Sequence, residues 1–187
     1  RNYSVNPSEL GTVIGLSISV AGLLGVLLGG MLADKLRQYT QKGKLHVAFI
    51  ANVISLVTLF AILCTSQLYL TYLLCFIYFL STPITHAPQT STITDLTIPR
   101  TRAIAVSLYI MLTIFLGAAL GPYCVGLISD GLSTANGMES GEALRQAMMW
   151  GLVPQAIGIV FMLLAIKHLP GDENSIVERA RALGEKI

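Results

Sequence analysis

Charged side chains are scarce in this sequence: Asp, Glu, Lys and Arg together make up 12% of its 187 residues. A water-soluble domain usually carries about 25% charged residues. The mean hydropathy of +0.69 is correspondingly high. We therefore expect a lipid bilayer to surround most of the chain. The net charge of +2 is too small to indicate a nucleic-acid partner.

Residues that bind metals or form disulfides are also few. The three cysteines, Cys64, Cys75 and Cys124, all lie within apolar runs, where cysteine behaves as a small hydrophobic side chain. The sequence has no Cys-x-x-Cys pair and no His/Cys spacing typical of a metal site. We expect neither a metal nor a cofactor, and the cysteines indicate no particular redox compartment.

Long apolar segments, in contrast, are abundant. About 20 apolar residues are enough to cross the hydrocarbon core of a bilayer, and five segments have about this length or more. We place these spans at about residues 10–32, 45–63, 69–94, 103–129 and 147–169. The sequence thus predicts an all-α integral membrane protein whose transmembrane bundle, 10–169, follows a polar lead-in at residues 1–9.

Residues 170–187 form a different kind of segment. Ser175 and Glu178 fit a capping box at the start of a helix, and the apolar residues around them share one helical face. The pattern predicts a short amphipathic helix that lies on the membrane surface. A frayed chain end is the alternative interpretation.

Basic residues divide unevenly between the two membrane sides that five spans create. One side receives the loops at 33–44 and 95–102 and the tail from Lys167, while the other receives only Arg1 and Arg145. The first side holds the other ten Lys and Arg residues: Lys35, Arg37, Lys42, Lys44, Arg100, Arg102, Lys167, Arg179, Arg181 and Lys186. Loops rich in Lys and Arg stay in the cytoplasm. We therefore predict a cytoplasmic 33–44 loop and tail, in a plasma membrane or inner membrane.

Small residues form a regular face on the first span. The face consists of Ser17, Ala21, Gly25, Gly29 and Ala33 at every fourth position, with Gly30 beside it. Small residues let helices in lipid approach closely, so we expect this face to pack against another helix. On the fourth span, Gly117 and Gly121 form a second pair of this kind, and Pro122 is expected to kink the helix.

The third span carries an unusual concentration of polar residues and two prolines in its second half, residues 81–92. Such groups need partners on neighbouring helices or in a water-filled cavity. Thr82, His86 and Thr90 share one helical face, and Gln89 lies beside it. Our hypothesis is that these four residues line a substrate path, with His86 as a proton or headgroup partner. A structural histidine, bonded to a backbone carbonyl near a proline, is the alternative.

One motif resembles that of a known family. Gly30-Met31-Leu32-Ala33-Asp34-Lys35 resembles the Gly-x-Leu-Ala-Asp-Arg signature that the major facilitator superfamily repeats after the second helix of each six-helix half. Residues 95–103 resemble its tenth-to-eleventh loop, and residues 117–130 resemble its eleventh helix. The resemblance implies the C-terminal half of such a transporter, with the five spans as helices eight to twelve. The usual signature continues with Gly-Arg, whereas this sequence has Arg37-Gln38 and offers Gly43-Lys44 only after an insertion.

The basic loop that ends in Gly43-Lys44-Leu45, and the Gly-Pro that is followed by Gly-Leu-Ile-Ser-Asp, are similar to Spinster-like lipid transporters. The resemblance implies a secondary transporter, a symporter or antiporter, that moves a small or amphiphilic, lysolipid-like substrate by alternating access. Its partners would be an N-terminal half, membrane lipid and the substrate. No acid lies inside a span, so any carboxylate that couples ions would come from the N-terminal half.

The family resemblance also implies that the loop after the signature acts as a conformational latch on the cytoplasmic side. The candidate latch residues are Asp34, Lys35, Arg37, Arg100 and Arg102. We expect Asp34 to bind a neighbouring helix start or Arg102 in one conformation only. A solvated acid that contributes nothing to gating is the alternative.

Other functions have less support in the sequence. Gly15-Leu16-Ser17 is faintly similar to the Gly-x-Ser of intramembrane serine proteases, but Ser17 already belongs to the small-residue face. We therefore expect no enzyme. A channel or a non-transporting membrane receptor on the same helical scaffold remains the alternative, and the sequence shows no selectivity ring.

Overall fold

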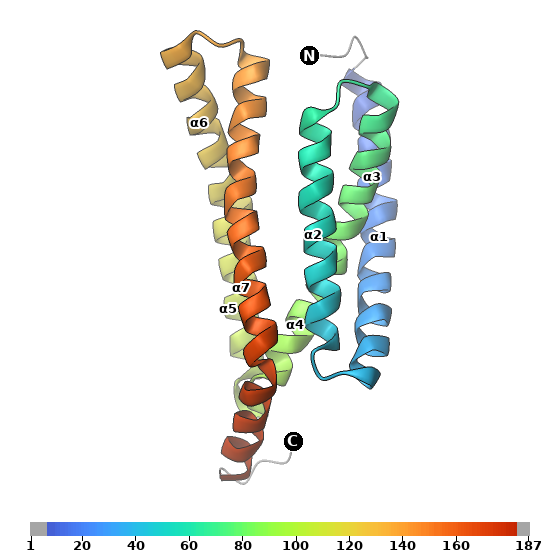
Figure 1. The fold of residues 1–187 in the computed structure, drawn as a ribbon, viewed down its shortest axis with the longest axis vertical. Coiled ribbons are helices and arrows are strands. Elements are labelled where there is room, and N and C mark those ends of the chain that lie inside the picture. The colour runs from blue at the N-terminus through green and yellow to red at the C-terminus, as the bar shows by residue number, and fades with distance from the viewer. Residues whose placement is uncertain (1–6, 183–187) are drawn as a thin grey trace.

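The computed structural model describes residues 7–182, and this part of the chain is built of helices without any strand (Figure 1). The elements are α1 (Pro7–Tyr39), α2 (Gly43–Cys64), α3 (Leu68–Ile84), α4 (His86–Asp95), the short 3-10 helix η1 (Pro99–Thr101), α5 (Arg102–Leu112), the π-helix η2 (Thr113–Leu120), α6 (Gly121–Asn136) and α7 (Ser140–Ala182).

Five stretches of the described chain are long and apolar enough to cross a bilayer. They are Ile14–Tyr39, Gly43–Cys64, Leu68–Asp95, Pro99–Ala135 and Ser140–Glu173. Large apolar side chains on them point outward, such as Leu23, which is 66% exposed, and Phe161, which is 65% exposed. Such exposure suits lipid rather than water. The predicted all-α membrane fold with five spans is confirmed.

The helices form two groups, which Figure 1 shows side by side. Helices α1, α2 and α3 pack on one another, while α6 packs on α7 and continues through η2 into α5. Helix α4 crosses from the first group to the second, and α2 packs against α7. The small buried core at this junction consists of Leu45 from α2 with Ile166 and Leu169 from α7.

Two glycines allow α1 to lie close against α3. A Cβ atom at Gly25 would lie 2.5 Å from the carbonyl oxygen of Leu80, and one at Gly29 would lie 2.5 Å from that of Ile84. Real side chains do not tolerate such distances, so any larger residue would push the helices apart. A Cβ at Gly30 would meet open space. Of the three glycines predicted to pack here, the structure therefore places two at the helix contact.

The third span is broken at Thr85, between α3 and α4. Pro83 and Pro88 lack the N–H that a helix needs at those positions, so the carbonyl of Ile84 has no donor at Pro88. At the break, the buried hydroxyl of Thr85 donates to the carbonyl of Thr82 at 2.8 Å. The break also leaves the Ile84 carbonyl facing Gly29, which explains why α1 needs a glycine there.

The distortion of the fourth span begins several residues before Pro122. Thr113–Leu120 is a π-helix, and Pro122 stands in the first turn of α6 directly after it. The ring of Pro122 crowds the backbone one turn earlier, which lies inside the π segment. Gly117 and Gly121 both face open space within the described part of the chain. The structure therefore gives these two glycines no helix contact there.

Three helices continue well beyond the predicted ends of their spans: α1, α7, and α6, which runs to Asn136 rather than ending at 129. Helix α1 extends through Tyr39, so residues 33–39 of the expected loop are helical. The stretch contains no Gly or Pro that would end the helix. Gly43 then permits the tight turn, because a Cβ there would clash with the backbone of Leu36.

Helix α7 likewise runs without a break through Pro170 to Ala182. The expected boundary between the fifth span and the tail is therefore not a break in the helix. Ile166 and Leu169 hold the turn before the proline by packing on α2. The predicted amphipathic face lies mostly on residues 177–187, whose side chains lie outside the described part of the structure. Residues 1–6 of the predicted lead-in also lie outside it.

Candidate functional site

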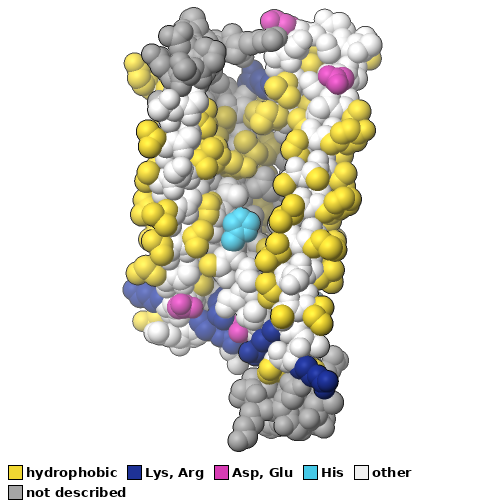
Figure 2. Space-filling view, turned by 180° about the vertical axis from the view of Figure 1, so that it is seen from behind, with side chains coloured by type: hydrophobic (Ala, Val, Ile, Leu, Met, Phe, Trp, Pro, Cys, Tyr) yellow, Lys and Arg dark blue, Asp and Glu magenta, His cyan; other side chains and the backbone are white. Residues whose placement is uncertain are grey.

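Basic side chains gather at one end of the molecule (Figure 2). This is the end where α1 ends, α2 begins and α4 meets α5 (Figure 1). Among the described residues, two ion pairs occur here, and both join helices that are far apart in the sequence.

The first ion pair joins α2 to α4. The Nζ atom of Lys44 lies 2.5 Å from Oδ2 of Asp95 and donates a further hydrogen bond of 2.7 Å to Oγ of Ser91. Lys44 is the second residue of α2, and Asp95 is the last residue of α4. A cation at a helix N-terminus and an anion at a C-terminus both oppose the helix dipole. Each charge is therefore unfavourable for its own helix, and their mutual attraction offsets this.

The second ion pair joins α1 to α7. Nη1 of Arg37 lies 2.6 Å from Oε1 of Glu173 and also donates to the carbonyl of Gln41 at 2.6 Å. The guanidinium group thus ties the end of α1 and its following turn to the distal part of α7. Because α1 and α7 belong to different helix groups, this contact bridges the two groups at the basic end.

The other candidate latch residues do not come together. Asp34, Lys35 and Arg100 are exposed, and Arg102 donates from Nε to the carbonyl of Thr97 at 3.3 Å. Within the described residues, Asp34 makes no hydrogen bond or ion pair, so the expected contact with the Arg100–Arg102 turn is not formed in this conformation.

Sequence reasoning did not identify Lys44, Asp95 and Glu173 as latch residues. In the sequence, Lys44 is one of the ten basic residues that predict the orientation, and Asp95 begins the predicted loop at 95–102. The signal in the sequence is that Lys44 lies near a helix N-terminus and Asp95 near a helix C-terminus. The helix dipole disfavours both charges there, so each needs a partner of opposite charge. Glu173 carried no such signal, because it lies well inside α7.

The four residues predicted to line the substrate path separate into two sets. His86 is exposed at the start of α4, where its carbonyl accepts the hydroxyl of Thr90 at 2.9 Å. The hydroxyl of Thr82 donates to the carbonyl of Tyr78 at 2.9 Å. These two threonines satisfy their hydroxyls on their own helices. Gln89 instead turns into a pocket.

This pocket, of about 520 Å³, lies between α2, α4, α5 and α7. Its polar atoms are mostly uncharged, and the hydroxyl of Tyr109 donates to Oε1 of Gln89 at 2.9 Å across it. Asn52 lines the α2 side, and its amide donates to the carbonyl of Ala48 at 3.1 Å. Thr92, Gln155 and one acid, Asp172, also line the pocket, and the other lining residues are apolar or Gly158. The pocket thus offers an amphiphile both a hydrogen-bonding wall and an apolar wall.

A second polar pair lies beside this pocket. Nε2 of Gln155, on α7, donates to Oγ of Ser55, on α2, at 2.9 Å. Both are isolated polar residues in apolar spans, and a polar group in hydrocarbon needs a partner. That requirement is a signal in the sequence from which this pair could have been found.

Comparison with known proteins identifies the family. The model of the Major Facilitator Superfamily matches residues 1–181, which is nearly the whole chain. The chain belongs to the major facilitator superfamily. The members of this superfamily are membrane transporters, and the family predicted from the sequence is confirmed.

A curated relative provides a more specific comparison. The "MFS-type efflux pump" of Mycolicibacterium smegmatis is 28% identical over 189 residues, which cover 97% of this chain and 41% of the relative. The chain therefore spans less than half the length of that relative. The superfamily signature at residues 30–35 lies at the end of α1, with Asp34 and Lys35 helical and exposed.

Proposed function

We propose that this chain is the C-terminal half, helices eight to twelve, of a secondary transporter that works by alternating access. The substrate is a small or amphiphilic molecule, of which lysolipid-like compounds are the leading class. The chain would rock against an N-terminal half around a site near the middle of the membrane.

The break between α3 and α4 carries this proposal. Transporters build their substrate sites from discontinuous helices near the membrane midplane. Here the break at Thr85 leaves His86 exposed and turns Gln89 towards Tyr109. The similarity to an MFS-type efflux pump supports transport out of the cell. The mostly uncharged pocket favours a substrate that carries few charges.

The proposed latch comprises the predicted residues together with the two observed ion pairs. In the orientation that ten of the twelve basic residues favour, Lys44–Asp95 and Arg37–Glu173 lie on the cytoplasmic side. They support a conformation in which the two helix groups are held together at that side. Asp34, with Lys35, Arg100 and Arg102, would engage in another conformation.

This chain offers few side chains for ion coupling. The spans contain no acid in their apolar interior, and His86 is the one readily titratable side chain deep within a predicted span. A symporter or antiporter mechanism would therefore use His86 or a carboxylate of the N-terminal half.

Counterflow in proteoliposomes tests this function. Full-length protein is reconstituted, loaded with unlabelled lysophospholipid or a lipophilic cation, and supplied with labelled compound outside. A carrier gives transient, saturable uptake of label above the equilibrium level. His86→Ala should reduce the initial rate, while Lys167→Gln, a change on an exposed residue of α7, should not.

Flux that rises linearly without saturation indicates a channel instead, and binding without flux indicates a receptor. A rate for His86→Ala equal to that of the native protein discards the role of His86 in the path.

A further inference from the structure

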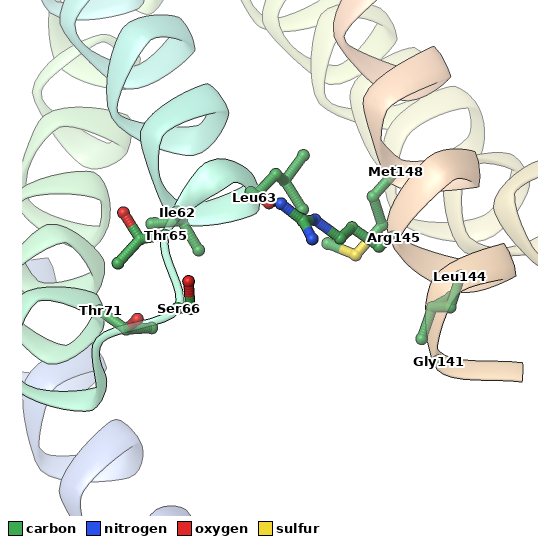
Figure 3. A pocket seen from close by; sticks show the side chains of 9 residues that line it. All are labelled: Ile62, Leu63, Thr65, Ser66, Thr71, Gly141, Leu144, Arg145 and Met148. Atoms are coloured by element: carbon green, nitrogen blue, oxygen red, sulfur yellow. Dashed lines mark hydrogen bonds between the residues drawn. The ribbon is translucent and has the colours of Figure 1, made fainter. Parts of the chain in front are cut away.

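Arg145 lies apart from the other described basic residues, at the opposite end of the bundle. It stands near the start of α7, and its Nε atom donates to the carbonyl oxygen of Leu63 in the last turn of α2. Figure 3 shows the side chain extending from α7 across to the end of α2. The last carbonyls of a helix lack partners within the helix, and a cation there also complements the helix dipole. This contact explains the position of Arg145, and within residues 7–182 it uses one of the guanidinium donors.

A pocket of about 270 Å³ surrounds the guanidinium group. The walls come from the end of α2, the following loop with Ser66, and the start of α7 with Leu144 and Met148 (Figure 3). No acidic residue lines the pocket. A guanidinium group has five N–H donors in a planar fork that matches phosphate. Among the described residues, Arg145 makes no ion pair, and the Ser66 hydroxyl lines the same pocket.

A second pocket lies deeper between the same two helices. It measures about 410 Å³ and is lined only by apolar residues: Leu56, Val57, Phe60, Leu152, Val153 and Ala156. On α7, Leu152 and Ala156 lie roughly 10–16 Å beyond Arg145, given the rise of about 1.5 Å per residue. One leaflet of hydrocarbon is about 15 Å thick. The distance between the two pockets thus matches the distance between the headgroup and the acyl chain of one lipid.

We propose that the α2–α7 contact at this end binds one phospholipid of the adjacent leaflet. Arg145 and Ser66 bind the phosphate, and one acyl chain occupies the pocket around Phe60 and Ala156. In the orientation favoured by the basic residues, this leaflet is the extracytoplasmic one. The site lies at the opposite end of α2 and α7 from the Lys44–Asp95 pair, and it requires only that the chain spans a membrane.

Native mass spectrometry of the full-length protein tests the site. Protein in detergent is titrated with phosphatidylglycerol and with diacylglycerol of the same chains, which lacks the phosphate. We expect phosphatidylglycerol to bind at least about tenfold more tightly, as a charge-assisted contact would give. Inorganic phosphate in large excess should not displace it, because phosphate lacks the chain.

Variants separate the two parts of the site. Arg145→Gln should remove the preference for phosphatidylglycerol, Arg145→Lys should keep most of it, and Ala156→Phe should weaken both lipids by filling the apolar pocket. Lys167→Gln, on the same helix at the other membrane end, serves as the matched control and should bind like the native protein.

Three results overturn the proposal. These are equal binding of the two lipids by the native protein, an unchanged preference in Arg145→Gln, and displacement of the lipid by inorganic phosphate. The last would make the pocket a site for a soluble anion. Arg145 also contacts α2, so Arg145→Gln could fail to fold. Ala156→Phe then provides the test, because unchanged lipid binding in this variant would equally contradict the site.

Discussion

Lys44 and Asp95 form an ion pair of 2.5 Å in which each partner stands at the unfavourable end of its own helix. The lysine begins α2 and the aspartate ends α4. Only 11% of the Lys44 side chain and 30% of the Asp95 side chain are exposed. The pair therefore lies between exposed pairs, which contribute about 0–1 kcal/mol, and buried ones, whose disruption costs about 3–5 kcal/mol. Because each helix dipole disfavours its own charge, the contact is weaker than an ion pair at the favourable helix ends. Such a contact is suited to breaking when the transporter changes conformation.

Exchange of these two charges tests that interpretation. Lys44→Gln and Asp95→Asn should each destabilise this conformation by about 1–3 kcal/mol, between the two limits above. The double variant Lys44→Asp with Asp95→Lys restores the pair and also places each charge at the end its helix favours, which adds about 0.3–1 kcal/mol per helix.

We expect the exchanged protein to melt at least as high as the native protein and to transport more slowly, since its latch opens less readily. Thermal unfolding and initial transport rates measure the two effects. An exchanged protein less stable than both single variants would show that the attraction between the charges is not what holds the contact.

The close approach of α1 to α3 gives a prediction about stability. Gly29→Ala should lower the melting temperature, because its Cβ would meet the Ile84 carbonyl at 2.5 Å; overpacking of this kind costs about 1–3 kcal/mol. Gly30→Ala, one residue away and facing open space, is the matched control and should change stability little. Differential scanning fluorimetry of the purified full-length protein compares them. Equal melting temperatures for the two variants would contradict the packing described here.

The pocket between α2, α4, α5 and α7 gives a prediction about substrate affinity. Tyr109→Phe removes the hydroxyl that donates to Gln89. If the substrate binds this wall, KM should rise by about three- to tenfold, which corresponds to one hydrogen bond, with little change in kcat. Thr113→Val, whose hydroxyl bonds only its own helix, is the control. A changed kcat with an unchanged KM would show that the substrate does not bind to this wall of the pocket.

Most of the fold could be predicted because its signals are local. The length and hydropathy of the five apolar segments determine the spans, and the prolines near Thr85 mark the break in the third one. The first span is predicted to end at residue 32, which is too early, because the basic residues after Ala33 indicate a loop although nothing there breaks α1 before Tyr39. Membership of the superfamily followed from residues 30–35, a short motif with a specific spacing.

The contacts of the candidate site were harder to predict. Lys44 and Asp95 are 51 positions apart, and their pairing depends on how α2 and α4 rotate about their own axes. The same rotation turns Gln89 into the pocket while leaving His86 exposed. Gly117 and Gly121 follow the same spacing as Gly25 and Gly29, yet only the latter two meet a neighbour in the described part of the chain. Spacing defines a helical face but does not say which partner lies against it.

The most direct test of alternating access is thiol labelling from the two membrane sides. His86→Cys is placed in a full-length protein from which Cys64, Cys75 and Cys124 are removed, and a membrane-impermeant maleimide is added to either side. With Lys44 and Asp95 intact, labelling from the side of the basic loops should be slow. Asp95→Asn should raise that rate about tenfold, because a tenfold change corresponds to the loss of roughly 1.4 kcal/mol from the latch. The same variant should lower the labelling rate from the opposite side. Labelling that rises from both sides, or from neither, would contradict a carrier gated by this pair.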